Sequence, residues 1–313
     1  MSLAFVFPGQ GSQAPGMGRD LADAFPLARE TFQEVDEALK QKLSRLMFEG
    51  PAEELTLTAN AQPALMAVSV AVVRVLAKEG GFDLGRQVAL VAGHSLGEYS
   101  ALTAAGAFDL ATAARLLRLR GEAMQAAVPP GEGAMAALLG AEAEQAAAIC
   151  AAAAEGEVLE VANDNGGGQV VVSGATAAVN RAVEAAKAAG VKRAMLLPVS
   201  APFHCAMMAP AARVMEEALG KATMAHPAVP VVANVTAAPV SDPEAIRALL
   251  VRQVTGTVRW RECVAAMVAA GCTRFAEVGA GKVLTGLMKR NAPEATALAL
   301  NTPADVEAFL KSL

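Results

Sequence analysis

Cysteine, histidine and surplus positive charge are all scarce in this chain of 313 residues, and each shortage excludes a class of protein. The four cysteines fall at no spacing typical of zinc ligands or of a disulfide framework. They are Cys150, Cys205, Cys263 and Cys272. We therefore expect free thiols and no metal site, which suits the reducing cytoplasm.

The charge balance argues against nucleic acid as a partner. Lys and Arg total 26 against 31 Asp and Glu, which gives a formal net charge of -5 at pH 7. Binding to a phosphate backbone needs clustered positive charge, and this chain has no surplus of it. Any acidic partner would have to meet a local basic patch.

Long uninterrupted apolar runs are also missing, although 54% of the residues are hydrophobic. A membrane-spanning helix needs roughly 18 or more consecutive apolar residues. The apolar stretches here are interrupted by charged side chains such as Arg74, Glu142 and Glu144. Residues 1–8 carry no basic segment of the kind that begins a secretory signal. We expect a cytoplasmic protein that does not bind a membrane.

What the sequence does contain is a glycine-bounded serine at residues 93–97, Gly-His-Ser-Leu-Gly, directly after the apolar run 87–92. A strand that passes through Gly-x-Ser-x-Gly into a helix makes a tight turn, and the turn holds the serine hydroxyl out at its tip. Ser95 is therefore a candidate nucleophile. The alternative is an ordinary strand-to-helix turn, because glycine and serine are common in turns.

Strand and helix signals alternate through most of the chain, which predicts an α/β fold with a parallel sheet. Before the Pro-Pro-Gly at 129–131 we expect strands at 3–7 and 87–92, a glycine-rich loop at 9–18, an amphipathic helix from there to about Leu43, two short helices flanking Pro51, and helices at 62–77, 98–105 and 110–127. After residue 200 we expect strands at 229–233 and 275–278 and helices at 243–253 and 282–289.

The stretch between these two parts has an order of its own. Strands at 134–139, 158–162, 169–173 and 193–199 and helices at 142–154 and 177–189 follow each other as β-α-β-β-α-β. This is the ferredoxin-like arrangement. The sequence predicts a small ferredoxin-like subdomain over 131–198, inserted into a large α/β subdomain made of 1–130 and 199–313.

A serine hydroxyl is a weak nucleophile until a base takes its proton, and the chain has three histidines to supply one. His94 adjoins the serine and should point elsewhere, and His226 lies in a turn-like stretch. His204 follows a strand expected to end at Val199, where active sites of α/β proteins usually lie. We assign His204 as the base; a histidine that only packs in a loop is the alternative. Cys205 is a poorer candidate nucleophile, because adjacent Cys and His side chains rarely face each other.

Two interpretations compete for the loop at residues 9–14, Gly-Gln-Gly-Ser-Gln-Ala. It matches the dinucleotide fingerprint Gly-x-Gly-x-x-Gly/Ala, but Pro15 and Gly16 interrupt the helix that should follow. The other interpretation is that the glycines aim an amide near Gln10 at a developing oxyanion. The amide of Leu96, which follows the nucleophile, would be the second donor.

One arginine of the helix before the Pro-Pro-Gly boundary is expected to face the apolar side. Arg118 and Arg120 lie about 160° apart around a helix, so one of them can share the side marked by Leu117 and Met124. Arg120 is the candidate, although the sequence alone leaves the choice open. An inward guanidinium needs an anion, and it binds a carboxylate with two hydrogen bonds. The alternative is a surface arginine paired with an acid such as Glu122.

Four motifs now stand in a fixed order along the chain: 7–13 (Phe-Pro-Gly-Gln-Gly-Ser-Gln), 93–98 (Gly-His-Ser-Leu-Gly-Glu), 120–125 (Arg-Gly-x-x-Met-Gln) and 201–204 (Ala-Pro-Phe-His). Together with Asn163-x-Asn165 and 169–174 they resemble the malonyl-CoA:acyl carrier protein transacylase family over nearly the whole chain. The resemblance implies an acyltransferase of type II fatty acid synthesis with a hydrolase-like core.

The same resemblance implies roles for particular residues. Ser95 would be the nucleophile, His204 the base and Arg120 the clamp for the malonyl carboxylate. The amides of Gln10 and Leu96 would form the oxyanion hole. The remaining site residues would be Gln253, whose backbone carbonyl orients the histidine, and secondarily Met124, Asn163 and Phe203. Pro202 and Cys205 depart from what close members of the family often have, whereas Phe203 resembles malonyl-selective members.

A third catalytic carboxylate is not evident. In hydrolase order it would lie between the serine and the histidine, and none of Asp109, Glu157 and Asp164 is compelling. A thioester is activated enough to react without one. The expected reaction is therefore a ping-pong transfer: Ser95 attacks malonyl-CoA, CoA leaves, and the carrier thiol then takes the malonyl group.

The resemblance also implies the partners. Malonyl-CoA would be a substrate, acyl carrier protein the partner, and no metal or redox cofactor would be needed; we expect a monomer. Carrier protein is acidic, so we hypothesise that its docking patch includes Lys187, Lys192, Lys289 and Arg290. Two alternatives remain: a serine esterase or thioesterase that uses the same elbow, and a nucleotide-binding or interaction module built on the loop at Gly9.

Overall fold

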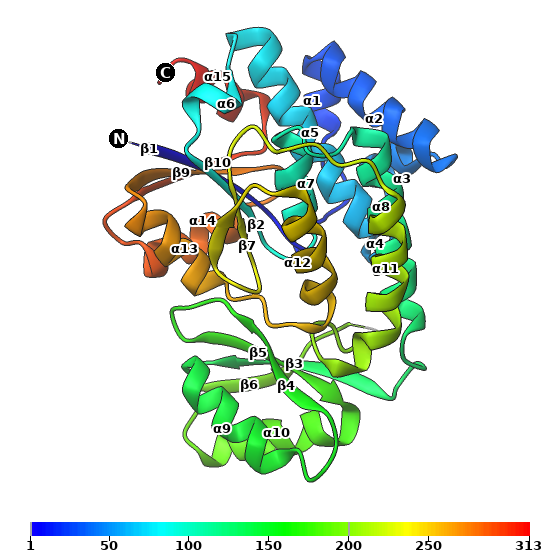
Figure 1. Cartoon of the computed structure of the whole chain (residues 1–313), viewed down its shortest axis with the longest axis vertical. Coiled ribbons are helices and arrows are strands. Elements are labelled where there is room, and N and C mark those ends of the chain that lie inside the picture. Colours follow the sequence, from blue (N-terminus) through cyan, green and yellow to red (C-terminus); the bar gives the residue numbers. More distant parts are fainter. Residues whose placement is uncertain (1, 200) are drawn as a thin grey trace.

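Two separate β-sheets organise the chain in the computed structural model, which describes residues 2–199 and 201–313 (Figure 1). One sheet has six strands in the order β10-β9-β1-β2-β7-β8, and the other has four in the order β4-β5-β3-β6. Helices pack around both. The predicted α/β class is confirmed.

The six-stranded sheet is parallel except at one edge. Its strands are β1 (Ser2–Phe7), β2 (Leu90–Gly93), β7 (Val231–Ala233), β8 (Ala238–Val240), β9 (Cys272–Val278) and β10 (Thr296–Leu300), and only β8 runs antiparallel, to β7. Side chains alternate across it: Phe5 and Phe7 enter one hydrophobic core and Ala4 and Val6 the other. Both faces of this sheet are therefore buried, as is usual for parallel strands.

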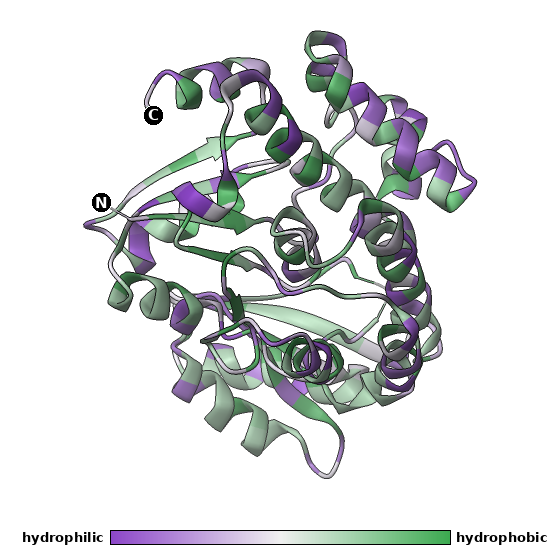
Figure 2. Ribbon diagram, turned by 45° about the horizontal axis from the view of Figure 1, so that its top comes forward, coloured by the Kyte–Doolittle hydropathy of each residue, from purple (hydrophilic) through white to green (hydrophobic). Residues whose placement is uncertain are grey.

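The part of the chain that contains this sheet also contains most of the helices. They are α1 (Arg19–Ala24), α2 (Pro26–Leu39), α3 (Leu43–Glu49), α4 (Ala52–Thr56), α5 (Thr58–Gly80), α6 (Leu84–Gln87), α7 (Gly97–Ala104), α8 (Leu110–Ala126), α11 (Ala209–Lys221), α12 (Pro243–Thr255), α13 (Trp260–Ala269), α14 (Val283–Asn291) and α15 (Pro303–Leu310), with a 3-10 turn at Ala206–Met208. Figure 2 shows hydrophobic residues along the inner strands and hydrophilic ones along the outer helices.

Helix α5 is the central helix of the larger core. By length and composition alone it could cross a membrane, but 83% of its most apolar window is buried inside the protein. It packs against α2, α7 and α8. The approach to α8 is close at Gly121, where a Cβ would lie 2.6 Å from the Cα of Ala59. The missing side chain lets the two helices touch directly beside Arg120.

The four-stranded sheet is wholly antiparallel and has helices on one face. Its strands are β3 (Gly133–Leu139), β4 (Leu159–Asp164), β5 (Gln169–Ala175) and β6 (Arg193–Leu196), and its helices are α9 (Ala143–Ala153) and α10 (Thr176–Ala188). Met135 and Val171, on the other face, join the larger core of the molecule. The face without helices is thus turned toward the six-stranded sheet and its helices.

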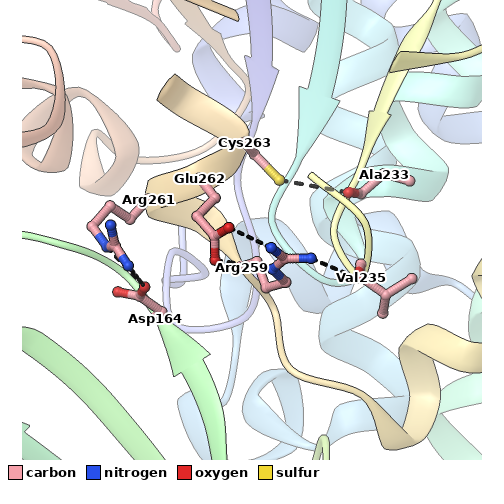
Figure 3. A network of polar contacts seen from close by, with 7 residues as sticks. All are labelled: Asp164, Ala233, Val235, Arg259, Arg261, Glu262 and Cys263. Atoms are coloured by element: carbon pink, nitrogen blue, oxygen red, sulfur yellow. Dashed lines mark hydrogen bonds and ion pairs between the residues drawn. The ribbon is translucent and has the colours of Figure 1, made fainter. Parts of the chain in front are cut away.

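Backbone pairing joins β4 to the segment before α13. Asp164 N donates to the carbonyl of Val258 (2.9 Å), and Val258 N donates to the carbonyl of Ala162 (2.8 Å). An ion pair of 2.8 Å between Arg261 of α13 and Asp164 lies beside them (Figure 3). The four-stranded sheet is therefore joined to the rest of the protein by main-chain bonds as well as by side chains.

Some boundaries differ from those expected. The single helix to Leu43 is wrong, because Pro26 begins a new helix and Phe25 before it is extended. The strand expected at 87–92 begins only at Leu90, since α6 occupies the preceding residues. The strand expected at 193–199 ends at Leu196. The patterns of α11, α13, α15, β8 and β10 were missed.

Candidate active site

A strained turn between β2 and α7 carries Ser95. Ser95 has a φ of 53°, which an L-residue adopts only when its surroundings enforce it. Its amide donates to Asn234 Oδ1 at 2.8 Å. A Cβ on Gly93 would lie 1.8 Å from the carbonyl carbon of Gly97, and one on Gly97 would lie 2.3 Å from the Phe7 oxygen. The two glycines are therefore required by close backbone approach.

His204 lies against the serine on a loop that is also strained. Its Nε2 is 2.8 Å from Ser95 Oγ, and its Nδ1 is 2.8 Å from the backbone oxygen of Gln253. Because that carbonyl can only accept, Nδ1 carries the proton and Nε2 is free to accept from the hydroxyl. Burial, and secondly the charge of Arg120, lower the pKa of His204 to about 3. The imidazole is therefore neutral at pH 7.

Arg120 points into the same site. Its Nη1 donates to Gln62 Oε1 (2.8 Å), and its Nη2 donates to Gln253 Oε1 (2.8 Å) and to Ser95 Oγ (3.2 Å). Its side chain is buried, and Nε has no hydrogen-bond partner within the described residues. Arg118 instead contacts Asn60 and Gln41, away from the serine. The structure thus places Arg120 inward, and its charge meets no carboxylate in an ion pair among the described residues.

A cavity of about 350 Å³ opens over these side chains. Of the site residues expected from the sequence, all but one line it: Ser95, His204, Arg120, Gln10, Leu96, Met124, Asn163 and Phe203. Gln253 is fully buried behind them. The rest of the wall includes Met135, Asn165, Val171 and residues 197–199. The cavity therefore lies between the two sheets.

The loop at Gly9 packs onto the serine turn. A Cβ on Gly9 would lie 2.7 Å from the carbonyl oxygen of His94. The side chain of Gln10 donates to Thr58 Oγ1 at 3.2 Å. Leu96 is the residue immediately before α7, where helix amides are unpaired. The positions of Gln10 and Leu96 suit the expected oxyanion hole, which stays a prediction.

The carboxylates considered for a third catalytic role are engaged elsewhere. Asp109 caps α8 by accepting from Thr112 N, Asp164 pairs with Arg261, and Glu157 pairs with Arg181. His204 Nδ1 contacts a neutral carbonyl instead.

Sequence reasoning missed several residues around the serine. Asn234 accepts from the backbone amide of Ser95, and Gln62 accepts from the guanidinium of Arg120. Glu98 accepts from Gln253 Nε2 at 2.8 Å. His94 Nε2 is 2.8 Å from Asn165 Oδ1, which joins the turn to the β4–β5 loop. A glutamine inside the long apolar helix α5 and an acid directly after the serine turn were the available signals.

The comparisons with known proteins identify the class to which the chain belongs. Residues 4–304 match the family model described as Acyl transferase domain. The match covers most of the chain and places it in the class of acyl transferase domains.

Individual relatives narrow the class. Over 309 residues the chain is 50% identical to the malonyl CoA-acyl carrier protein transacylase of Escherichia coli (strain K12), with 99% of each chain covered. An acyl-carrier-protein-S-malonyltransferase from Bartonella henselae has a similar crystal structure, with a TM-score of 0.98, 56% identity, and 100% of this chain and 99% of that chain covered. The solved structure of a malonyl-transacylase in complex with its type II PKS acyl-carrier protein is also similar, with a TM-score of 0.96, 45% identity, and 100% of both chains covered. The chain belongs to the malonyl CoA-acyl carrier protein transacylase family, as its motifs predicted.

Proposed function

We propose that this chain moves a malonyl group from malonyl-CoA to the phosphopantetheine thiol of acyl carrier protein, through a malonyl ester on Ser95. The observation that carries the proposal is the position of Arg120. A buried arginine needs a compensating anion. This one lies 3.2 Å from the nucleophile and forms no ion pair within the described residues; the Glu98 carboxylate acts on it only through its charge, from beyond ion-pair distance. A carboxylate on the acyl group is the anion that would complete the site.

The geometry supports a base-assisted attack. His204 Nε2 accepts the proton of Ser95 Oγ as the oxygen bonds to the thioester carbon, and the Gln253 carbonyl holds the Nδ1 proton. The amides of Gln10 and Leu96 are the proposed donors to the oxyanion. The tetrahedral intermediate collapses, the C–S bond breaks, and the proton passes from His204 to the CoA sulfur.

The second half-reaction reverses these steps with a different thiol. The carrier thiol gives its proton to His204 and attacks the malonyl ester, and Ser95 leaves with that proton. Arg120 holds the malonyl carboxylate through both halves, while Met124 and Phe203 shape the wall of the cavity. No step requires a metal or a redox cofactor. Within the described residues no group of three or more His, Cys, Asp or Glu side chains gathers.

The finer description of the fold is part of the same proposal. The large part, 1–130 and 199–313, is a hydrolase-like subdomain in which the serine lies at the carboxyl end of β2. The part over 131–198 is a ferredoxin-like subdomain, supported by its β-α-β-β-α-β order and by the strand order β4-β5-β3-β6. Four free, buried thiols suit a cytoplasmic location. The monomeric state stays a prediction.

Carrier docking is proposed beside the cavity. Arg290 donates to the carbonyl of Gly167 at 3.0 Å, next to the loop that brings Asn165 into the cavity wall. Lys192 lies next to Gly140, where β3 and β6 of the four-stranded sheet end and begin. Charge reversal at Arg290 should raise the KM for carrier protein at low salt, with the KM for malonyl-CoA as the control. An unchanged KM for carrier protein would defeat this patch.

Intact-mass measurement tests the proposed function. The protein mixed with malonyl-CoA should gain one malonyl group, keep it in buffer, and lose it to carrier protein as malonyl-carrier appears. Ser95→Ala should gain none. A thioesterase would instead discharge the ester to water without carrier, and an adduct that forms on Ser95→Ala would contradict the nucleophile.

A further inference from the structure

A buried carboxylate behind the nucleophile takes no part in the steps above. Glu98 lies in the first turn of α7 and is 1% exposed. One oxygen, Oε2, accepts from Gln253 Nε2 at 2.8 Å and from the amide of Asn234 at 3.1 Å. Glu98 has no ion-pair partner within the described residues. Because Glu98 is buried beside the serine turn and does not line the cavity, any role it has must be exerted through neighbouring residues rather than by contact with substrate.

The amide of Gln253 is held in one orientation by what surrounds it. Nε2 faces three acceptors: Glu98 Oε2 at 2.8 Å, the carbonyl of Ser95 at 3.0 Å and Asn234 Oδ1 at 3.3 Å. Oε1 faces the Nη2 donor of Arg120 at 2.8 Å. A flipped amide would set its oxygen against the acceptors and its NH₂ against the guanidinium, which leaves both sides unpaired in a dry site.

We propose that Glu98 is a positioning residue for malonyl recognition: it fixes the Gln253 amide so that Oε1 anchors the Arg120 guanidinium at the nucleophile. This inference rests on the proposed function, because its consequence is selectivity for an acyl group that carries a carboxylate. The carboxylate is the strongest of the three acceptors around Nε2. Ser95 O and Asn234 Oδ1 have other duties in the turn.

The consequence for the arginine follows from its small number of anchors. Gln62 Oε1 holds Nη1 and Gln253 Oε1 holds Nη2. Two-point binding of a carboxylate requires a fixed guanidinium plane. Without Glu98 the Gln253 amide loses its preferred orientation, and one of the two anchors of Arg120 is lost with it. Acetyl transfer, which uses no carboxylate clamp, should be affected much less.

The ionisation of Glu98 is compatible with this role. Burial raises its pKa to about 7, against hydrogen bonds from Gln253 and Asn234 and the charge of Arg120, which lower it. Either protonation state leaves an oxygen that can accept from Nε2. The acceptor, rather than the charge, is therefore the property that matters for the amide.

The test uses Glu98→Met, which removes the acceptor, and Glu98→Gln, whose amide oxygen can replace it. The measured quantity is the ratio of kcat/KM for malonyl-CoA to that for acetyl-CoA, which does not depend on how much of a preparation is folded. Glu98→Met should lower the ratio about tenfold, as expected when the hydrogen bond from the charged Arg120 to Gln253 Oε1 is lost. Glu98→Gln should keep the ratio within about threefold, as expected when the hydrogen-bond acceptor is retained.

A double-mutant cycle tests whether Glu98 acts through Gln253. Gln253→Met, which leaves the backbone carbonyl in place, should lower the ratio by a similar factor, and the double variant should be no worse than either. The proposal would be overturned if Glu98→Met lowered kcat/KM equally for both substrates, or if Glu98→Gln lowered the ratio as much as Glu98→Met does. It would also be overturned if the effects of Glu98→Met and Gln253→Met on the ratio were additive, or if Gln253→Met left the ratio unchanged. A wild-type ratio near one would defeat the proposed function itself, and this inference with it.

Discussion

The two sheets contribute to the cavity in different ways. Around the six-stranded sheet, polar side chains hold one another: Ser95, His204, Arg120 and Gln253 are joined by hydrogen bonds of 2.8 to 3.2 Å. The four-stranded sheet contributes apolar side chains and the two amides of Asn163 and Asn165. One side of the cavity carries the proposed catalytic groups, and the other side forms the facing wall.

This difference shows where precision is needed. A nucleophile and its base must be placed within a few tenths of an ångström, and parallel strands buried on both faces provide such a frame. A wall that excludes water tolerates more variation, because apolar contacts are not directional. Variants on the two sides should therefore fail in different ways: substrate choice should change on one side, and efficiency or stability on the other.

Arg120→Ala should show the largest effect of the variants that keep the nucleophile. Malonyl transfer should fall by about 10²–10³-fold, because a bidentate, charge-assisted contact is lost. Acetyl transfer should stay within about tenfold, since acetyl has no carboxylate to bind. Steady-state kinetics with both CoA thioesters measures this. Arg118→Ala, on the same helix but directed away from the serine, is the matched control and should change neither rate.

Equal losses for both substrates in Arg120→Ala would show that the arginine supports the structure rather than selecting the acyl group. Arg120→Lys sharpens the point. It keeps the charge but lacks the planar fork, so malonyl transfer should recover only in part.

The pH dependence should separate His204 from an ordinary histidine. Its pKa of about 3 lies below the reference value, so the neutral base persists as the solution is acidified. From pH 7 to pH 5, kcat/KM should stay nearly level, whereas with a base of pKa near 6.5 it would fall about 25-fold. A fall in kcat/KM centred near pH 6.5 would contradict the buried, neutral imidazole.

The buried side chains of His204 and Glu98 give the free energy of unfolding pH dependences of opposite sign. The depressed pKa of His204 contributes stability that is present above about pH 6.5 and is lost as the pH falls toward 3. The raised pKa of Glu98 contributes stability that is present below about 4.5 and is lost as the pH rises through 7. Unfolding in denaturant at several pH values measures both, and Glu98→Gln should remove the second dependence.

The sequence predicted the parts of this site that local motifs encode. The glycines around Ser95, the strand before it and the arginine helix each leave a pattern of spacing or periodicity. Asn234 leaves no comparable pattern, and Glu98 is visible after the serine turn without any indication of its role. Both roles depend on contacts between residues more than a hundred positions apart, such as Asn234 N with Glu98 Oε2. The role of Gln253 came from family resemblance rather than from the residues alone.

The fold was predicted unevenly for the same reason. The order of elements over 131–198 followed from alternating patterns and turn residues, and the structure contains those strands and helices. The edge strands β8 and β10 were missed. Strand β8 has only three residues, none of them buried, and β10 is a short apolar run, which does not by itself distinguish a strand from a helix. The break at Pro26 was readable in principle, because proline favours a helix start.

Asn165→Ala tests the side of the cavity formed by the four-stranded sheet. It removes the acceptor for His94 Nε2, so the serine turn loses a contact while Arg120 keeps all of its own. We expect kcat/KM to fall about 3–10-fold, as for one neutral hydrogen bond, and by the same factor for malonyl-CoA and acetyl-CoA. Asn165→Asp, which keeps an acceptor, should recover part of the loss. A change in the ratio of kcat/KM for malonyl-CoA to that for acetyl-CoA would contradict the proposed difference between the two sides of the cavity.

The smallest effect is expected at the junction of the sheets. The side chain of Arg261 is 41% exposed and that of its partner Asp164 is 6% exposed (Figure 3). Arg261→Ala therefore leaves a nearly buried carboxylate that still accepts from the backbone amide of Gly166. Unfolding free energy should fall by about 1 kcal/mol, which is a few degrees in Tm. Arg259→Ala is the control and should cost less, because its partners are the partly exposed Glu262 of α13 and, at 3.4 Å, the carbonyl of Val235. In both variants the ratio of kcat/KM for malonyl-CoA to that for acetyl-CoA should be unchanged, because the backbone pairing of Val258 with Ala162 and Asp164 remains. If Arg261→Ala instead lowered malonyl transfer as Arg120→Ala does, the position of the wall, and not only its composition, would belong to the catalytic frame.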